Sequence, residues 1–229
     1  MNLINNSTVL TNSEFSRRAI ANAFGVNDIR VLSPPVDTER FRNILTSNID
    51  NKRKDMVLVV SRIDPYKQIE NAIKLGKILK EKNIGTGMKI VGTLYNHYIK
   101  YYKYLKQMVI DLNLGRYISF EINASLNKLF SIMREAKVYF HPMREEPFGI
   151  SVVEAMAAGL FPIVPDVGGP TEFVPRNFHF NSLEKAADIV SSALDRPYEE
   201  RIRISNSVEK FSTSNYILGF QSIVNELLY

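Results

Sequence analysis

The sequence predicts an α/β protein with a doubly wound parallel β-sheet. Short runs rich in Val and Ile alternate with longer segments in which apolar residues recur at helical spacing. The short runs are apolar almost throughout, which is typical of strands covered by helices on both faces of a sheet. Ligands bind such sheets outside the carboxyl ends of the strands. We therefore expect a site among the loops at 62–67, 92–95 and 142–149.

The elements of this sheet can be placed in order along the chain. Strands are predicted at 55–61, 88–92, 117–122, 137–142 and 161–167, with 178–180 as a candidate sixth. Helices are predicted over 68–82, 96–114 and 126–136, from near Gly149, and through most of the remainder. The Tyr and Lys residues at 98–106 could contact nucleic acid or a membrane, but the apolar spacing there favours an ordinary crossover helix.

The first 45 residues differ from this pattern. The segment 7–25 resembles a strand that turns into a helix, and 29–41 resembles a strand followed by an extended Pro-Pro linker. We interpret residues 1–45 as the end of a preceding domain plus a linker, 46–212 as the sheet domain, and 213–229 as a C-terminal helix.

The composition is that of an ordinary globular protein. Of 229 residues, 45% are hydrophobic and 23% charged, and the net charge of +5 favours anionic partners such as nucleotides or phosphates. A nucleic-acid-binding face would be more densely basic, so no nucleic-acid partner is expected. The absence of Cys excludes disulfides and thiolate chemistry. Without a signal-like start or an apolar run near the ~20 residues that span a bilayer, we expect a cytoplasmic protein, with peripheral contact at the cytoplasmic face of a membrane left open.

Several common ligand-binding signatures are missing. No G-x-G-x-x-G follows a strand, and neither a P-loop nor a D-x-D pair is present. The three histidines, His97, His141 and His179, lack the spacing of metal ligands. We therefore expect a site that uses neither a metal nor a cofactor.

Arg62 and Lys67 follow the strand at 55–61 directly. An Arg fork and a Lys charge at the carboxyl edge of a sheet can neutralise phosphate oxygens. The alternative is a pair of solvated basic residues on a turn, and the position at the edge favours phosphate binding.

A second candidate lies in the segment 146–154. Phe148, Gly149 and Ile150 would present backbone N–H groups at a helix N-terminus, where the helix dipole also favours an anion. Glu146 precedes this helix and Glu154 lies one turn inside it. Glu146 could instead only complement the helix dipole, and Glu154 could lie on a solvated face. However, the helix around Glu154 is apolar, and a lone carboxylate there costs free energy unless it is paired.

Three motifs in this order resemble those of retaining GT-B glycosyltransferases of family 4. Glu146 to Glu154 resembles the E-x7-E motif, "VVSRIDPYK" resembles "vGRl-x-x-x-K", and "VPDVGGPTEFV" resembles "GG-x-x-E". The likeness extends over most of 8–194 and is nearest to α1,2-mannosyltransferases that extend the dolichol-linked oligosaccharide from GDP-mannose. Met143 and Ile122, where relatives commonly carry Ser and Gly, depart from the general family and agree with this narrower group.

The resemblance implies roles for individual residues. Arg62 and Lys67 would bind the donor diphosphate and stabilise the leaving group, and Glu146 would orient the sugar, which makes these three the catalytic candidates. Glu154 would hold the ribose, and no residue is assigned as a nucleophile. The other implied donor contacts are Gly92, Phe148, Gly149, Ile150, Gly168, Gly169 and Glu172. The implied donor is a nucleotide sugar, with GDP-mannose favoured and a UDP-sugar as the alternative.

The implied architecture is half of a two-domain enzyme. In such a family the sheet domain binds the donor, while an N-terminal domain, in cis or in trans, binds a glycan or lipid-linked acceptor. The C-terminal helix would then cross back toward that domain, or pack on 8–24 in its absence. The alternatives are a subunit of a split enzyme, a non-catalytic nucleotide-sugar-binding module and, least favoured, an epimerase or phosphorylase.

Overall fold

A six-stranded parallel sheet forms the centre of the molecule, in the order β5-β4-β3-β6-β7-β8. The computed structural model describes residues 8–46 and 53–228. The strands are β3 (Lys54–Val60), β4 (Gly87–Gly92), β5 (Ile118–Ile122), β6 (Ala136–Phe140), β7 (Phe161–Pro165) and β8 (His179–Phe180). The chain winds outward from β3 to β5 and returns to β6, so the direction of winding reverses between β3 and β6. This is the crevice where doubly wound sheets bind ligands.

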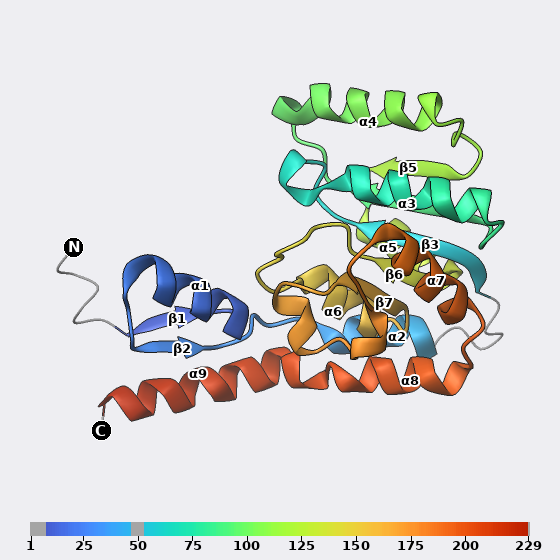
Figure 1. Ribbon diagram of the computed structural model, residues 1–229. Helices are drawn as coiled ribbons and strands as arrows, with labels where there is room; N and C mark the ends of the chain where they lie inside the picture. The colour runs from blue at the N-terminus through green and yellow to red at the C-terminus, as the bar shows by residue number, and fades with distance from the viewer. Residues whose placement is uncertain (1–7, 47–52, 229) are drawn as a thin grey trace.

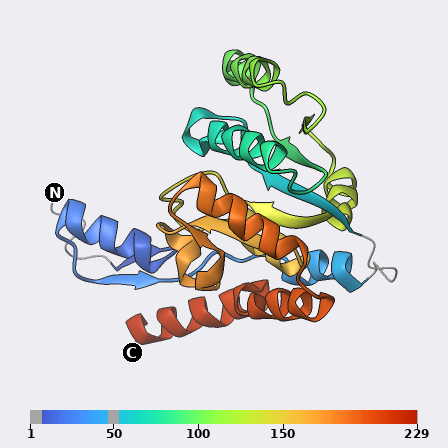
Figure 2. The ribbon, with the colours of Figure 1, turned by 45° about the vertical axis from the view of Figure 1, so that its right-hand side comes forward.

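Helices cover both faces of the sheet (Figures 1 and 2). On one face, α3 (Ile69–Glu81) packs against α4 (Ile99–Asp111) and α7 (Leu183–Leu194). On the other, α6 (Ile150–Ala157) packs against α2 (Thr38–Thr46) and α8 (Tyr198–Ser207), and α5 (Leu126–Glu135) packs against α2. Leu58, Val59 and Phe140 are fully buried between these layers. The predicted doubly wound fold is therefore confirmed.

Most predicted elements are found within two residues of their expected bounds. The candidate sixth strand is β8, paired in parallel with β7. The segment 96–114 divides into a short 3-10 turn, η2 (Asn96–Tyr98), and α4, which connects β4 to β5 and buries Leu105 and Val109. The interpretation of 98–106 as part of a crossover helix is confirmed.

The segment 38–46 corrects the expectation of an extended linker through residue 41. It forms α2, in which Phe41, Ile44 and Leu45 are buried at helical spacing. Asp37 starts the helix by accepting a hydrogen bond from the Arg40 N–H to its Oδ1 at 3.2 Å. The Pro-Pro pair favours an extended segment, but the apolar periodicity after it is that of a helix.

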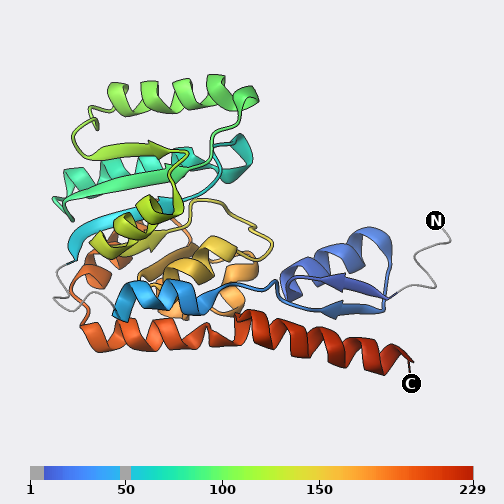
Figure 3. The same cartoon turned by 180° about the vertical axis from the view of Figure 1, so that it is seen from behind.

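Residues 8–31 form a small unit beside the main sheet (Figure 3). It consists of β1 (Val9–Thr11), α1 (Glu14–Phe24) and β2 (Ile29–Val31), and its two strands pair in parallel. The predicted strand-to-helix turn in this segment is confirmed. Residues 1–7 of the expected tail and 47–52 of the expected sheet domain lie outside the described residues.

The C-terminal helix α9 (Thr213–Leu228) extends along this small unit (Figure 1). Glu226 forms an ion pair with Arg30, and a Cβ added at Gly219 would lie 3.1 Å from Leu32 Cδ1. The helix thus lies against Arg30 and Leu32, whereas the expected packing was on 8–24. In the described parts of the chain, no helix combines the length and apolarity required to cross a membrane.

Candidate functional site

A cavity of about 640 Å³ opens at the carboxyl ends of β3 and β6. Its size is within the range of small-molecule binding sites. Two of the three predicted loops, 62–67 and 142–149, line it, because the strands that precede them, β3 and β6, are neighbours in the sheet, whereas the third predicted loop, 92–95, is not part of the lining. The lining residues are Asn12, Pro34, Ser61, Arg62, Tyr66, Lys67, His141, Met143, Glu146, Pro147, Phe148, Gly149, Ile150 and Ser151.

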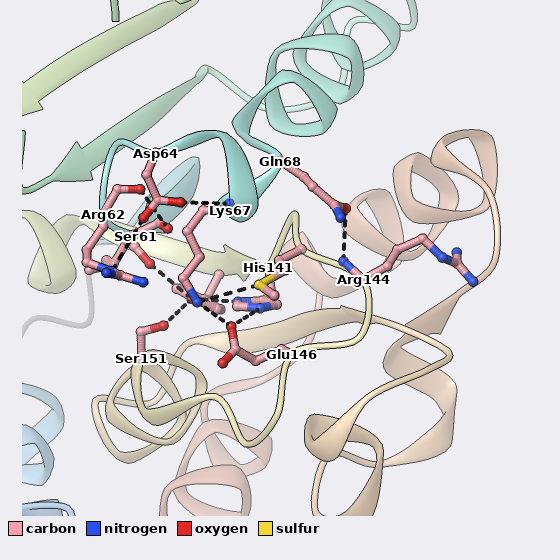
Figure 4. Close-up of polar contacts among 12 residues, drawn as sticks. Ser61, Arg62, Asp64, Lys67, Gln68, His141, Arg144, Glu146 and Ser151 are labelled. Atoms are coloured by element: carbon pink, nitrogen blue, oxygen red, sulfur yellow. Dashed lines mark hydrogen bonds and ion pairs between the residues drawn. The ribbon is translucent and has the colours of Figure 1, made fainter. Parts of the chain in front are cut away.

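Arg62 and Lys67 enter the cavity from the loop after β3. Asp64, which is buried, accepts a hydrogen bond from the Lys67 backbone N–H at 3.2 Å and thereby starts the 3-10 turn η1 (Pro65–Lys67). The Arg62 side chain is 58% exposed, with Nε 3.5 Å from Asp64 Oδ2. Lys67 points inward, and its Nζ lies 2.7 Å from Glu146 Oε2 (Figure 4). The two basic groups therefore differ, since Arg62 is exposed at the rim and Lys67 is paired with the Glu146 carboxylate.

Glu146 is held by two groups that approach the same oxygen. Besides Lys67 Nζ, His141 Nε2 lies 3.3 Å from Oε2, although its N–H is not aligned for a full hydrogen bond. Burial alone would raise the pKa of Glu146, but the adjacent His141 and Lys67 lower it to about 2. Glu146 is therefore ionised at any physiological pH. It does more than complement the helix dipole, because it also forms an ion pair with Lys67.

The N-terminus of α6 faces the cavity as expected. Gly149 has φ of 98°, a left-handed conformation that turns the chain sharply into the helix. Within the described residues, no hydrogen bond engages the backbone N–H groups of Phe148, Gly149 or Ile150. The Phe148 side chain is buried against Phe173 and Phe211 and anchors the loop. The backbone is thus arranged to receive an anion.

Glu154 lies one turn further along α6, beyond the lining of the cavity. Its neighbours on the helix, Val152, Val153, Ala155 and Met156, are fully buried. Burial raises its pKa from 4.5 to about 7, and among the described residues no group pairs with its carboxylate. A carboxylate in such surroundings without a partner is costly to stability and is typical of functional sites.

The other three predicted glycines, Gly92, Gly168 and Gly169, are packing positions around the site. A Cβ at Gly92 would lie 2.4 Å from Ser61 O, so this glycine lets the loop of Arg62 approach β4. A Cβ at Gly168 would lie 3.0 Å from Glu146 N and O, and one at Gly169 would lie 2.1 Å from Pro147 O. Gly169 N–H also donates to Glu146 O at 2.8 Å. Gly168 and Gly169 therefore support the loop that carries Glu146, and any direct contact with a ligand stays a prediction.

Glu172 lies away from the cavity. Its carboxylate accepts hydrogen bonds from the backbone N–H groups of Glu14, at 3.0 Å, and Phe15, at 2.7 Å. Both N–H groups belong to the first turn of α1, where a negative charge is favoured. Nearby, the Ser13 hydroxyl donates to Pro147 O at 2.5 Å. These contacts fasten the small N-terminal unit to the loops around the cavity.

Three residues of the site went unrecognised in the sequence. Tyr139, His141 and Ser151 form a buried polar group behind Glu146. The spacing of His141 in the sequence indicates no metal-ligand set. Its place at the end of a predicted strand, at the carboxyl edge of the sheet, was the signal that could have found it. In the described residues, no group of three or more His, Cys, Asp or Glu is arranged to hold a metal ion.

Comparison with known proteins identifies the family. The model of the family described as "Glycosyl transferases group 1" matches residues 40–211. The chain belongs to this family. The match includes Arg62, Lys67 and Glu146, which line the cavity, and Glu154 on α6, so the cavity is that of a group 1 glycosyl transferase.

Curated relatives of this group 1 glycosyl transferase are named GDP-Man:Man(3)GlcNAc(2)-PP-Dol alpha-1,2-mannosyltransferase. The protein from Dictyostelium discoideum is 26% identical over 216 residues, covering 88% of this chain and 43% of the relative. The protein from Homo sapiens is 27% identical over 237 residues, covering 96% of this chain and 48% of the relative. The chain thus spans less than half the length of these relatives.

Solved structures confirm the Rossmann-like fold of the GT-B type. A glycosyltransferase from Rickettsia africae superimposes with a TM-score of 0.80 at 18% identity, covering 97% of this chain and 64% of that one. Anabaena Alr3699/HepE in complex with UDP and glucose gives a TM-score of 0.74 at 20% identity, covering 96% and 63%. At these identities, the likeness establishes the fold.

Proposed function

We propose that this chain is the donor-binding half of a retaining glycosyltransferase that transfers mannose from GDP-mannose to a lipid-linked glycan. The observation that carries the proposal is the convergence of Lys67, Arg62 and the open α6 N-terminus on one cavity beside Glu146. The names of the curated relatives support the donor and the acceptor class. The chain's partial coverage of those relatives supports an acceptor domain, in cis or in trans, as the other half of the cleft.

The donor diphosphate binds at the α6 N-terminus. Backbone N–H groups at Phe148, Gly149 and Ile150 donate to phosphate oxygens, and the helix dipole adds to this attraction. Arg62 folds inward from the rim to form paired hydrogen bonds, and Lys67 supplies a charge. When the bond between sugar and phosphate breaks, negative charge grows on the diphosphate, and these donors stabilise it without a metal ion.

The two glutamates hold the two ends of the donor. Glu146 keeps Oε1 clear of Lys67 and His141, since both approach Oε2, and Oε1 accepts a hydrogen bond from a sugar hydroxyl. Glu154 accepts from the ribose hydroxyls, which supply the partners that its carboxylate lacks in the chain itself. The protein works in the cytoplasm, at the membrane face that presents the acceptor.

Titration calorimetry tests the donor assignment. We expect GDP-mannose and GDP to bind, UDP and ADP to bind more weakly, and Lys67→Ala to lose about tenfold or more in affinity for the removal of one charge-assisted contact. An exposed lysine outside the cavity, Lys103, provides the matched control as Lys103→Ala. Binding of no nucleoside diphosphate, or equal binding by Lys67→Ala, would refute the site.

Reconstitution tests the activity. Mannosyl transfer that requires addition of the N-terminal segment of a relative would support a divided or partial transferase. Donor binding without transfer in the presence of every acceptor domain tried would instead make the chain a nucleotide-sugar-binding module. A new epimer formed from the nucleotide sugar alone would indicate an epimerase.

A further inference from the structure

A buried hydroxyl connects three elements behind the cavity. Tyr139 on β6 is fully buried, and its Oη lies 2.8 Å from Ser151 Oγ, 3.3 Å from His141 Nδ1 and 3.4 Å from Val60 O. Ser151 belongs to the first turn of α6, and Val60 ends β3 just before Arg62. Burial raises the pKa of Tyr139, so the hydroxyl keeps its proton. It therefore has one hydrogen to donate, and both Val60 O and His141 Nδ1 lie within reach of it.

His141 lies between Tyr139 and Glu146 and connects them. The ring is 2% exposed, with Nδ1 toward Tyr139 and Nε2 at 3.3 Å from Glu146 Oε2. An imidazole lone pair facing a carboxylate would be repulsive, so the hydrogen belongs on Nε2. Nδ1 can then accept the Tyr139 hydrogen in place of the more distant Val60 O, and the Tyr139 oxygen in turn accepts from Ser151. The hydrogen bonds thus have one direction, from Ser151 through Tyr139 and His141 toward Glu146.

Lys67 and His141 both lie next to the Glu146 carboxylate, but only Lys67 would also bind the donor diphosphate. Lys67 is a flexible ammonium that a bound diphosphate would draw away from the carboxylate. His141 is enclosed and fixed by Tyr139, and Nε2 has no completed hydrogen bond among the described residues. A small rotation of the Glu146 carboxylate would complete that bond once Lys67 turns toward phosphate.

We propose that His141 is a positioning residue that keeps Glu146 Oε2 in place and leaves Oε1 for the donor sugar, with Tyr139 selecting the Nε2–H form of the ring. The inference rests on the proposed function, because it takes Glu146 as the sugar contact. It predicts an effect on the sugar end of the donor that spares the diphosphate end.

Calorimetry with GDP-mannose and with GDP distinguishes an effect on the sugar end of the donor from an effect on its diphosphate end. We expect His141→Ala to weaken GDP-mannose binding about tenfold, the loss of one hydrogen bond to a charged group, and to change GDP binding less than about twofold. His141→Gln, whose amide N–H reaches toward the position of Nε2, should recover most of the affinity. His97→Ala serves as the control, since His97 lies on η2, outside the cavity. Equal weakening of GDP and GDP-mannose, or no recovery in His141→Gln, would overturn the proposal.

Nitrogen-15 NMR of the imidazoles tests the same idea without any ligand. The three histidines can be assigned from the single variants, and we expect His141 in the Nε2–H form in the unaltered chain and as a mixture in Tyr139→Phe. If His141 carries its hydrogen on Nδ1, the inference is overturned, even if the chain binds GDP-mannose. Failure of the unaltered chain to bind any nucleotide would instead overturn the proposed function, so the two failures can be told apart.

Discussion

Replacing Glu154 by Gln should make the protein more stable at alkaline pH while it weakens donor binding. Glu154 is partly buried on α6 with no pairing group among the described residues, and burial raises its pKa from 4.5 to about 7. A shift of about 2.5 units corresponds to roughly 3 kcal/mol at ~1.4 kcal/mol per unit, which is the free energy of holding the ionised form in this place. A neutral amide of nearly the same shape avoids this cost.

The sign of the effect follows from the direction of the pKa shift. Below about pH 4.5 the carboxyl group is protonated in both the folded and the unfolded chain, so it costs nothing. As pH rises toward about 7, the unfolded chain releases its proton first and the stability of the unaltered protein falls. Glu154→Gln should therefore match the unaltered protein near pH 4 and exceed it by up to roughly 3 kcal/mol near pH 8.

Urea unfolding across this pH range measures the difference. Glu199→Gln, which alters an exposed carboxylate on α8, is the control and should follow the unaltered protein at every pH, because it retains Glu154. In parallel, the affinity of the unaltered chain for GDP-mannose should rise as Glu154 ionises, and Glu154→Gln should lose about tenfold and show no such rise. A stability gain that is the same at every pH would refute the account of the buried charge.

Three further changes test the loops around the cavity. Glu146, with its pKa lowered to about 2, should stabilise the fold above about pH 4.5 and lose that contribution as pH falls toward 2. In acid unfolding, the unaltered protein should therefore lose its stability advantage over Glu146→Gln across this pH range. Glu172→Ala removes the acceptor from two N–H groups and should cost about 1–2 kcal/mol and speed hydrogen exchange in α1, with GDP affinity unchanged; slowed exchange or lost GDP binding would contradict this role. Gly169→Ala places a Cβ 2.1 Å from Pro147 O and should displace the loop of Glu146, abolishing donor binding by calorimetry, whereas Gly115→Ala, at an open position, should not.

Much of the fold was accessible from the sequence because it depends on local patterns. Apolar runs and helical periodicity predicted the order of strands and helices, and the carboxyl-edge rule placed Arg62, Lys67 and Glu146 in one region. The segment 38–46 shows the limit of such patterns, because the preceding prolines outweighed a helical repeat that packing against α6 then stabilised. Local signals compete, and tertiary burial decides between them.

The roles of individual side chains depended on contacts across the chain. Lys67 and Glu146 are 79 residues apart in the sequence, and Glu172 caps a helix 158 residues away. Sequence motifs marked Glu172 as a donor contact, yet only the folded chain shows its oxygens bound to the α1 N-terminus. By itself, the sequence determined the family, the sheet and the basic edge, because residue type and spacing encode them. The tertiary structure decided that Glu146 is paired, that Glu154 has no partner among the described residues and that Glu172 binds the α1 N-terminus. The physical reason is that charge and burial act through distances in space, which the spacing of residues along the chain does not specify.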